Sequence, residues 1–451
     1  MGNPKHYDLA VIGSGTAAMV AAMRVREAGW TVAVIDQRPF GGTCALRGCD
    51  PKKMLVGGAS ALDHARRMQG KGIAGDVLID WSELIAFKRS FTEPVPAKHE
   101  ASYRAKGIDT YRGRARFTGR DALAIDGAAI EARYVLLAAG AEPVRLHIPG
   151  EEHLVTSEQF LELDALPGRI ALVGGGYIAA EFSHIAARAG ARVTILQRAP
   201  RLLTHFDADC VGWLREAFAR WAIDVRTRTA VHAIEKRGAA FVVHARAGPR
   251  ALALEADLVV HAAGRAPALE PLDLDAGGVQ TEKGGLKLNG YLQSVSNAAV
   301  YAAGDAAQAG PPLTPVSSHD AKVVAANILH GNHAKPDYRS VPSVAFSIPP
   351  IAAVGLSEEA ARSRGLRFRV NSAKASDWFT ARQAAEPVYA YKVLLEEESE
   401  RILGAHLVGP HADEVINIFA LAMRNDLNAA QLRGTMFAYP TGASDIGYML
   451  G

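Results

Sequence analysis

Two cysteines separated by four residues, Cys44 and Cys49, carry the most reactive side-chain chemistry in this chain of 451 residues. They lie in the segment 41–53, which reads GGTCALRGCDPKK. Thiols at this spacing can close a small reversible disulfide, and a following cation such as Lys52 biases their reactivity. The third cysteine, Cys210, has no partner in sequence, so a structural disulfide framework is excluded. A close cysteine pair in a thiol-poor chain is typical of a catalytic disulfide in a reducing compartment.

A glycine-rich loop occurs twice, each time between an apolar strand and a helix. GSGTAA at 13–18 follows a strand expected over 8–12, and GGGYIA at 174–179 follows one expected over 169–173. The next strand ends in register, with the offset from 13 to 36 equal to that from 174 to 197. Each unit therefore predicts a dinucleotide site with the pyrophosphate at the helix N-terminus.

A second pair of similar segments supports an internal duplication. AAGAEP at 138–143 resembles AAGRAP at 262–267, and each follows an apolar strand. Two such echoes in one chain are difficult to obtain by chance. We therefore expect an electron path that joins two nucleotide sites to one dithiol.

The residue at the end of each second strand predicts the ligand. Asp36 can accept hydrogen bonds from ribose hydroxyls, which favours FAD or NAD in the first unit. The matched Gln197 has no carboxylate and is followed by Arg198 and, nearby, Arg201, which favours the 2′-phosphate of NADPH over NADH. The alternative interpretation is that both arginines are solvated surface charge.

Composition limits the function classes. A net charge of +3 gives no reason to expect nucleic acid or a membrane surface as a partner. With 49% hydrophobic and 22% charged residues, the chain resembles a soluble globular enzyme. The polar N-terminus runs directly into a strand, which leaves no room for a signal peptide, so we expect a cytoplasmic protein.

The rest of the chain divides by pattern. Residues 81–106 are expected to be helical with a break at Pro94 and Pro96, and 111–137 to form a small antiparallel meander. The tail after Pro336 predicts an antiparallel sheet and a helix over 413–424, as in an assembly domain. The predicted strands of the tail are 341–355, 368–371, 388–395 and 402–408.

Together these motifs resemble the pyridine nucleotide–disulfide oxidoreductases, which include glutathione reductase, dihydrolipoyl dehydrogenase and mercuric ion reductase. The pattern GGTC-x4-C-x-P-K at 41–52 is the most specific match. YAAGD at 301–305, LTPV at 313–316 and GRARF at 113–117 are similar to further segments that hold FAD in the family. The resemblance covers essentially the whole chain.

The resemblance implies an α/β fold with two Rossmann-like dinucleotide-binding domains and a C-terminal α+β dimerisation domain. The FAD-binding part would comprise residues 1–143 and 265–335. Residues 144–264 would bind NAD(P)H, and 336–451 would form the dimerisation domain. A homodimer and no metal site are implied.

The resemblance also implies catalytic roles. Cys49 would be the thiolate next to the flavin, and Cys44 the interchange thiol that attacks the substrate. Lys52 would lie by the flavin and pair with Glu181, while Tyr177 would gate the nicotinamide pocket. Lys52 and Glu181 also fit an ordinary ion pair, and Arg47 fits either steering of an anionic substrate or simple exposure.

Cofactor contacts carry over by position. For FAD they are Gly13, Gly15, Ala18, Asp36, Gly42, Thr43, Lys52, Ala115, Gly140, Asp305 and Thr314. For NADPH they are Gly174, Gly176, Ile178, Glu181, Arg198 and Gly264. Ala179, where relatives that use NAD more often have glycine, further favours NADPH.

One segment departs from the family pattern. In FAYPTGASD at 437–445, Tyr439 replaces the histidine that serves most thiol-reducing relatives as acid–base, and Ser444 stands where its orienting glutamate would be. Tyrosine has a reference pKa of about 10, so it is a poor base but a serviceable proton donor. We expect Tyr439 to project into the disulfide site of the partner subunit.

The electron acceptor is therefore open. The leading interpretation is an FAD-dependent, NADPH-preferring reductase of a small-molecule or protein disulfide. The alternatives are a metal-ion or quinone reductase, similar to mercuric ion reductase, and an enzyme similar to dihydrolipoyl dehydrogenase. The C-terminal cysteine pair of mercuric ion reductases is missing from YMLG at 448–451, which counts against mercury. A flavin-bearing redox sensor is a further class, which the Lys52, Glu181 and Tyr177 set disfavours.

Overall fold

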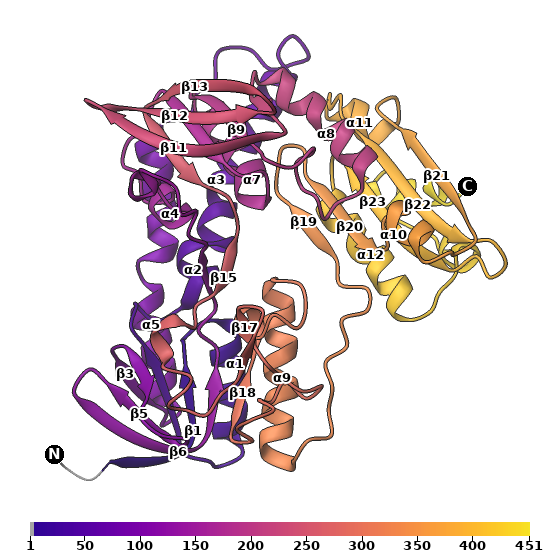
Figure 1. Cartoon of the computed structure of the whole chain (residues 1–451). Coiled ribbons are helices and arrows are strands. Elements are labelled where there is room, and N and C mark those ends of the chain that lie inside the picture. Colours follow the sequence, from indigo (N-terminus) through magenta and orange to yellow (C-terminus); the bar gives the residue numbers. More distant parts are fainter. Residues whose placement is uncertain (1–3) are drawn as a thin grey trace. The chain divides into compact units, whose positions relative to one another are not determined.

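The computed structural model describes residues 4–451, and its contacts divide the chain into two compact units. The first comprises residues 4–52, Lys88–Val144 and Arg265–Tyr338, and the second comprises Lys53–Phe87, Arg145–Gly264 and Arg339–Gly451. Colour in Figure 1 follows the sequence, so several colours occur within each unit. Both units are thus assembled from segments that are distant in sequence.

The first unit is built on a seven-stranded sheet in the order β3-β2-β1-β6-β5-β4, with β18 also paired to β6. Its parallel strands are β1 (Lys5–Ile12), β2 (Val32–Asp36), β3 (Asp109–Arg112), β6 (Ala128–Leu137) and β18 (Val300–Ala302). The expected meander supplies the antiparallel strands β4 (Ala115–Phe117) and β5 (Ala122–Ile125). Residues 9–12 of β1 are buried, as in a parallel strand covered on both faces.

Helices and short strands of the first unit carry the loops that matter for chemistry. α1 (Thr16–Glu27) follows the first glycine-rich loop, and α9 (Thr314–His330) packs beside it. α2 (Gly42–Arg47) and the start of α3 (Cys49–Arg67) carry the two cysteines. The remaining elements are α5 (Val95–Ala105), β7 (Ala141–Pro143) paired with β15 (Arg265–Pro267), β16 (Thr281–Glu282) paired with β17 (Gly285–Leu286), and the 3-10 turns Glu270–Leu272 and Gly304–Ala306.

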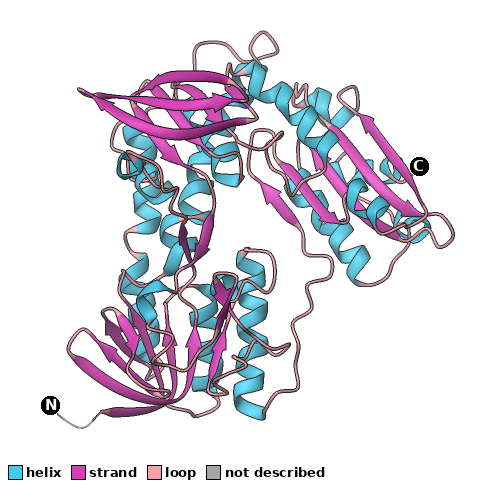
Figure 2. Cartoon of the chain, in the orientation of Figure 1, coloured by secondary structure: helices cyan, strands magenta, loops and turns pink. Residues whose placement is uncertain are grey.

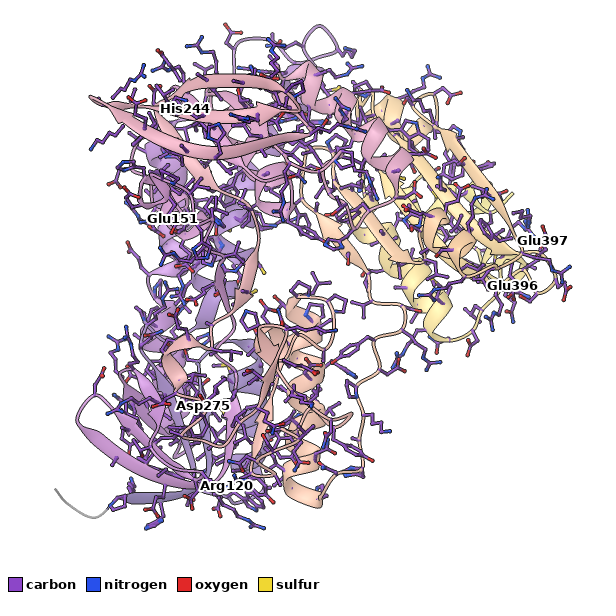
Figure 3. The ribbon with its side chains drawn as sticks, viewed as in Figure 1. Arg120, Glu151, His244, Asp275, Glu396 and Glu397 are labelled. Atoms are coloured by element: carbon purple, nitrogen blue, oxygen red, sulfur yellow. The ribbon has the colours of Figure 1, made fainter. Side chains whose placement is uncertain are left out.

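The second glycine-rich loop lies in the second unit, on a parallel sheet in the order β10-β9-β8-β14. Its strands are β8 (Arg169–Val173), β9 (Arg192–Leu196), β10 (Asp224–Arg226) and β14 (Leu258–His261). α7 (Tyr177–Arg188) follows the loop, and α8 (Ala208–Arg220) follows β9. An antiparallel sheet of β11 (Thr229–Arg237), β12 (Ala240–Ala247) and β13 (Arg250–Ala256) was not predicted. His244, labelled in Figure 3, lies on β12 of this sheet.

Polar contacts fix the chain where it enters the second unit. The carboxylate of Glu151, labelled in Figure 3, accepts the backbone N–H groups of Leu146 and His147 at 2.9 and 2.7 Å. It also pairs with the guanidinium of Arg145, which lowers the pKa of Glu151. Two short helical segments follow, the 3-10 turn Glu151–His153 and α6 (Ser157–Phe160). This anchor therefore lies shortly before β8, the first strand of the parallel sheet of the second unit.

The tail forms an antiparallel sheet in the order β19-β20-β23-β22-β21, as expected. Its strands are β19 (Ser343–Ala345), β20 (Ile351–Gly355), β21 (Phe368–Lys374), β22 (Ala390–Glu396) and β23 (Ile402–Val408). α12 (Ala412–Arg424), the expected helix, packs on β20 and β23 (Figures 1 and 2). The other helices of the tail are α10 (Glu358–Ser363), α11 (Phe379–Gln383), α13 (Ala429–Arg433), the 3-10 turn Gly442–Asp445 and α14 (Ile446–Met449).

The predicted fold class is confirmed: Figure 2 shows helices and strands in both units. The predicted break in the helical segment 81–106 is confirmed as well, since α4 (Trp81–Thr92) ends before Pro94 and α5 begins at Val95. Every helix within residues 4–451 is too short or too polar to cross a membrane.

Candidate active site

The two cysteines lie in α2 and at the start of α3, both within the first unit, and share one hydroxyl partner. Cys44 is half-buried within α2, and Cys49 is exposed at the first position of α3. The Thr314 hydroxyl, at the start of α9, donates to Cys44 Sγ at 3.1 Å. The same oxygen lies 3.3 Å from Cys49 Sγ. The structure therefore brings together three of the predicted site residues, with both sulfurs as thiols.

The two thiols have opposite acidities. The hydrogen bond from Cys44, helped by the Thr314 hydroxyl and the charge of Lys52, lowers the pKa of Cys49 to about 6, although partial desolvation of the sulfur opposes the shift. The same hydrogen bond and burial raise the pKa of Cys44. At neutral pH the pair therefore holds one proton, with Cys49 as the thiolate and Cys44 as the thiol.

The first glycine-rich loop fits a dinucleotide. Gly13 has φ +110°, and a Cβ there would lie 2.2 Å from the carbonyl oxygen of Ala138. Gly15 caps α1 without a side-chain hydrogen bond, so the N–H groups of the first turn remain available to a pyrophosphate. A Cβ on Gly42 would lie 2.3 Å from Gly15 Cα, so position 42, at the start of α2, cannot carry a side chain either.

Asp36 is positioned as a hydrogen-bond acceptor at the end of β2. Its carboxylate accepts the Ser14 hydroxyl at 2.6 Å and the backbone N–H of Arg38 at 2.8 Å. The Ser14 oxygen in turn accepts the N–H of Gly41 at 3.1 Å. The sequence interpretation missed this bridge, although a hydroxyl residue between the two glycines was a visible signal. The arrangement fixes the carboxylate at the end of β2, and its contact with ribose hydroxyls stays a prediction.

The other residues predicted to contact FAD lie in varied surroundings within the first unit. Asp305 is half-buried, and burial raises its pKa against the charge of Arg265. Ala18 and Ala115 are buried, and Thr43 is half-buried at the start of α2. Gly140 has φ +71°, and no atom lies within 4 Å of a Cβ built on it. These placements fit an extended dinucleotide, and the individual contacts stay predictions.

The second glycine-rich loop repeats this geometry in the second unit. Gly174 has φ +116°, and a Cβ there would lie 2.1 Å from the carbonyl oxygen of Ala262. Gly176 caps α7 without a side-chain hydrogen bond, and no atom lies within 4 Å of a Cβ built on it. Gly264 is likewise open, with φ +116°, and Ile178 is half-buried in the first turn of α7. The loop therefore fits a second pyrophosphate.

The two arginines expected near this loop behave differently. Arg198 is exposed, and none of residues 4–451 forms a hydrogen bond or an ion pair with its guanidinium. The Arg201 guanidinium instead donates to the carbonyl oxygens of Phe206 and Thr204, at 2.5 and 3.0 Å. Gln197 donates to the Arg201 carbonyl at 3.3 Å. Arg198 is thus the available cation, while Arg201 stabilises the loop.

α7 carries both predicted nicotinamide residues. Tyr177 lies half-buried in its first turn, packed edge-on against Phe206 with ring centroids 5.6 Å apart. Burial raises the pKa of Tyr177, while a hydrogen bond with Ser343 opposes the shift. Glu181 is 6% exposed and accepts the N–H of Phe346 at 2.8 Å, an anchor that the sequence did not reveal.

Lys52 belongs to the first unit and Glu181 to the second, so their predicted pairing stays a prediction. Lys52 is 8% exposed. Arg47 is half-buried in the last turn of α2, and its role also stays open. Cys210 is fully buried in α8, where burial raises its thiol pKa well above the usual value, so it is chemically inert.

The segment around Tyr439 contains no histidine–glutamate pair. The Tyr439 side chain is exposed. Asp445, the nearest carboxylate in sequence, is buried and accepts the Tyr389 hydroxyl at 2.7 Å. Ser444 is held in a reciprocal cap with Thr441. Within the described part of this subunit, no group is therefore arranged to tune Tyr439 as the usual glutamate tunes histidine.

Comparison with known proteins agrees with this geometry. Residues 7–321 match the family model described as pyridine nucleotide-disulphide oxidoreductase. This chain belongs to that family. Residues 341–449 match the family's dimerisation domain, which supports assembly as a homodimer.

Relatives and solved structures extend the match over nearly the whole chain. A mercuric reductase of Staphylococcus aureus is 32% identical over 98% of this chain and 81% of its own length. A glutathione reductase of Burkholderia cepacia is 31% identical over 97% of each chain. The Cu(II) complex of the HOCl-induced flavoprotein disulfide reductase RclA of Escherichia coli superposes with a TM-score of 0.89 at 27% identity, covering 99% of each chain.

Membership establishes the general chemistry. Like other pyridine nucleotide-disulphide oxidoreductases, the protein is a flavoprotein oxidoreductase that uses FAD, a pyridine nucleotide and a redox-active disulfide. Cys44 and Cys49 are the close cysteine pair of the chain, which has one further cysteine.

Proposed function

We propose that the protein transfers electrons from NADPH, through FAD, to the Cys44–Cys49 disulfide and then to a disulfide acceptor. The observation that supports this most directly is the shared hydroxyl of Thr314, which bonds one thiol and contacts the other while their acidities diverge. When bound, FAD supplies the chemistry that converts hydride transfer into reduction of sulfur.

The protonation of the pair balances the reaction. Reduction of the disulfide by one hydride equivalent delivers two electrons and one proton. This gives one thiolate and one thiol, which is the state expected above pH 6. Cys44 then loses its proton and attacks the acceptor disulfide as a thiolate. A mixed disulfide forms, and the first acceptor sulfur takes up that proton and leaves as a thiol. The Cys49 thiolate attacks Cys44 Sγ, which restores the Cys44–Cys49 bond and releases the second acceptor sulfur.

The hydrogen bond between the two thiols gives the pair its asymmetry, because it lowers the pKa of Cys49 and raises that of Cys44. The Thr314 hydroxyl lowers the pKa of both thiols and so stabilises negative charge at the pair, and Lys52 adds a positive charge near Cys49. Tyr439, from the partner subunit, is proposed to donate the proton that the departing acceptor thiolate needs. The roles of Tyr177 and Glu181 in holding the nicotinamide end, and of Lys52 beside FAD, are proposed on the same basis.

NADPH is proposed over NADH because of the exposed, unpaired guanidinium of Arg198 at the end of β9. The matched position in the first unit carries the carboxylate of Asp36, whereas this unit has the neutral Gln197. A guanidinium binds a phosphate through paired hydrogen bonds, whereas a carboxylate at this position would repel the 2′-phosphate.

A second candidate acceptor is a metal ion that binds thiolates, such as Hg(II) or Cu(II). Three observations favour it: the relatives named as mercuric reductase, the RclA structure solved with Cu(II), and the exposed Tyr439 in place of a tuned histidine. Residues 4–451 contain no group of three or more His, Cys, Asp and Glu side chains able to hold a metal ion. The metal would therefore be a substrate, bound between the two sulfurs as thiolates.

The sulfur chemistry can be tested by absorbance. Anaerobic NADPH should produce a long-wavelength charge-transfer band that Cys49→Ser abolishes and Cys210→Ser leaves unchanged. Because the pKa of Cys49 is lowered to about 6, the band should be present above that pH and disappear as the pH falls through it. A parent protein without such a band at pH 8 would exclude the dithiol mechanism.

The acceptor is tested by turnover. Initial rates on a panel of small and protein disulfides, Hg(II), Cu(II) and quinones should rank a disulfide first. Turnover of every disulfide should be lost in Cys44→Ser. A metal ion that outcompetes all the disulfides would favour the second candidate, and quinone reduction that survives Cys44→Ser would show that the acceptor bypasses the sulfur pair. Tyr439→Phe should slow disulfide turnover, and an unchanged rate would exclude Tyr439 as the proton donor.

A further inference from the structure

A charged cavity of about 450 Å³ lies in the second unit, away from the nucleotide loop. Its wall is formed by the C-terminal parts of α3, α7 and α8, together with 348–349 and 385–387. Arg188 ends α7, whose first turn belongs to the nucleotide loop. At a rise of about 1.5 Å per residue, the 12 residues of α7 separate the two places by roughly 18 Å.

The floor of the cavity is a buried ionic network in which the Asp63 carboxylate is fully used. Arg188 donates to Asp63 Oδ1 through Nε at 3.0 Å and through Nη2 at 2.6 Å. Arg67 donates to Oδ2 at 2.8 Å, and the indole N–H of Trp221 donates to Oδ1 at 2.8 Å. Glu386, the second carboxylate in the wall, lies 3.5 Å from Arg67. Both acidic groups of the cavity are therefore engaged by the floor cations.

The rim carries three further cations. Arg66, Lys71 and Arg220 are all exposed. The Arg66 guanidinium lies over the Trp221 ring, 5.1 Å from its centroid, and Lys71 donates to the backbone carbonyl of Arg67 at 3.0 Å. Within residues 4–451, neither Arg66 nor Arg220 forms an ion pair. Five cations thus face two carboxylates, which leaves a formal excess of three positive charges.

We propose that this cavity is a second anion site, which binds a small, multiply charged oxyanion. Its volume lies within the range of roughly 300–1,000 Å³ that is usual for small-molecule sites. Guanidinium groups match phosphate and carboxylate oxygens through paired, charge-assisted hydrogen bonds. The network below would keep Arg188 and Arg67 in position, while Arg66, Lys71 and Arg220 close on the ligand.

The buried floor supports this assignment. The Arg188 side chain is 1% exposed, and burial lowers its pKa to about 10 despite the neighbouring Asp63. Because Asp63 and Glu386 balance the two floor guanidiniums, the excess positive charge lies on the rim cations, where an added anion would compensate it. The simpler interpretation is that the rim arginines are ordinary solvated surface charges. Such arginines would not lie above a buried ionic network.

Calorimetric titration of the full-length, FAD-loaded protein would test the site. Pyrophosphate and citrate serve as the phosphate and carboxylate probes, with saturating NADP⁺ present and ionic strength held constant with NaCl. The variant is Arg66→Gln/Arg220→Gln, which changes two exposed side chains. The matched control is Arg215→Gln, an exposed arginine of α8 outside the cavity wall. FAD content and thermal unfolding of both variants verify that they are folded.

We expect the dissociation constant of the better probe to rise at least about tenfold in the double variant, because two charge-assisted contacts are lost. In Arg215→Gln it should stay within about twofold, the change typical of an uninvolved surface charge. Tighter binding of pyrophosphate would identify a phosphate ligand, and tighter binding of citrate a polycarboxylate. The proposal is wrong if neither probe binds the parent protein, if the double variant binds equally well, or if only Arg198→Gln abolishes binding.

Discussion

The two glycine-rich motifs, each a strand, a loop, a helix and a second strand, have the same backbone hydrogen bonds and differ in one side-chain arrangement. Gly13 and Gly174 donate to the ends of β2 and β9, at Ile35 and Leu196, at 2.8 and 2.9 Å. Ala138 and Ala262 donate back to the first strand of each unit, at 2.9 and 2.8 Å. Each helix is followed two positions later by a glycine with positive φ, Gly29 or Gly190, which lies 16 positions after the first glycine of the loop.

The difference lies between the loop and the end of the second strand. In the first unit, Ser14 fills the second loop position and orients the Asp36 carboxylate. In the second, Gly175 leaves room for the Gln197 side chain, whose Cδ would lie 2.9 Å from a Cβ on that glycine. The amide turns toward the loop, so the exposed Arg198 supplies the local charge. A duplicated backbone thus presents an anion in one copy and a cation in the other.

The largest effects are expected from adding one methyl group to each loop. In Gly13→Ala and Gly174→Ala the new Cβ would overlap the carbonyl oxygen of Ala138 or Ala262, and no side-chain movement relieves a backbone clash. Gly13→Ala should fold with little or no FAD, measured by flavin absorbance per chain. Gly174→Ala should retain FAD but raise the KM for NADPH at least roughly hundredfold, because several phosphate contacts are lost together.

Gly29→Ala and Gly190→Ala are the matched controls. These glycines also have positive φ, +90° and +99°, but no atom lies within 4 Å of an added Cβ. Only the left-handed backbone is penalised, by about 1–2 kcal/mol, which lowers the melting temperature and leaves both cofactors bound. Loss of FAD in Gly174→Ala would show that the two loops do not act independently.

The charge difference itself is tested next, by Arg198→Gln. Removal of the exposed guanidinium should raise the KM for NADPH about tenfold to hundredfold, the effect of a lost charge-assisted contact. NADH lacks the 2′-phosphate, so its KM should change less than about twofold. Arg192→Gln, an exposed arginine at the opposite end of β9, is the control and should affect neither coenzyme. Equal losses with both coenzymes would refute the phosphate assignment.

Sequence alone predicted the shared part of the two units because that part is local. The apolar strand, the glycine turn and the helix each lie within about 25 consecutive residues, and their order determines their pairing. The antiparallel tail was equally readable from its strand periodicity. β11–β13 were missed. β11 is largely exposed and polar, whereas the apolar residues 240–243 of β12 and the apolar residues of β13 were signals that the sequence interpretation did not use.

The side-chain arrangements were harder to predict, because their partners are far apart in the chain. Thr314 meets Cys44 across 270 positions, and Asp63 meets Arg188 and Trp221 across 125 and 158. Arg201 shows the converse: it lies three residues from Arg198, yet it faces the loop carbonyls rather than the expected ligand. Residue type predicted the charge near the site, but the fold determined which charge is available.

A smaller effect is expected when the end of β9 is made to resemble the end of β2. Gln197→Glu adds a carboxylate at the position that matches Asp36, where it can accept ribose hydroxyls and repel a 2′-phosphate. Repulsion of about 1 kcal/mol in this partly exposed place should raise the KM for NADPH roughly fivefold while that for NADH falls. Gln197→Met removes the amide without adding charge and is the control. If the ratio of the KM values for NADPH and NADH changes equally in Gln197→Glu and Gln197→Met, the effect comes from the shape of the side chain and not from its charge.

The smallest change in coenzyme preference is expected from Arg201→Gln. Its guanidinium holds the carbonyl oxygens of Phe206 and Thr204, so its loss should lower the free energy of unfolding by about 1–3 kcal/mol. Because the loop then moves under both coenzymes alike, the ratio of the KM values for NADPH and NADH should stay within about twofold of the parent, whereas Arg198→Gln shifts it at least tenfold. Steady-state kinetics and thermal unfolding measure the two effects separately. A selective loss of NADPH binding in Arg201→Gln would mean that the guanidinium leaves the loop carbonyls when the coenzyme binds, and that the second copy uses two cations where the first uses a single carboxylate.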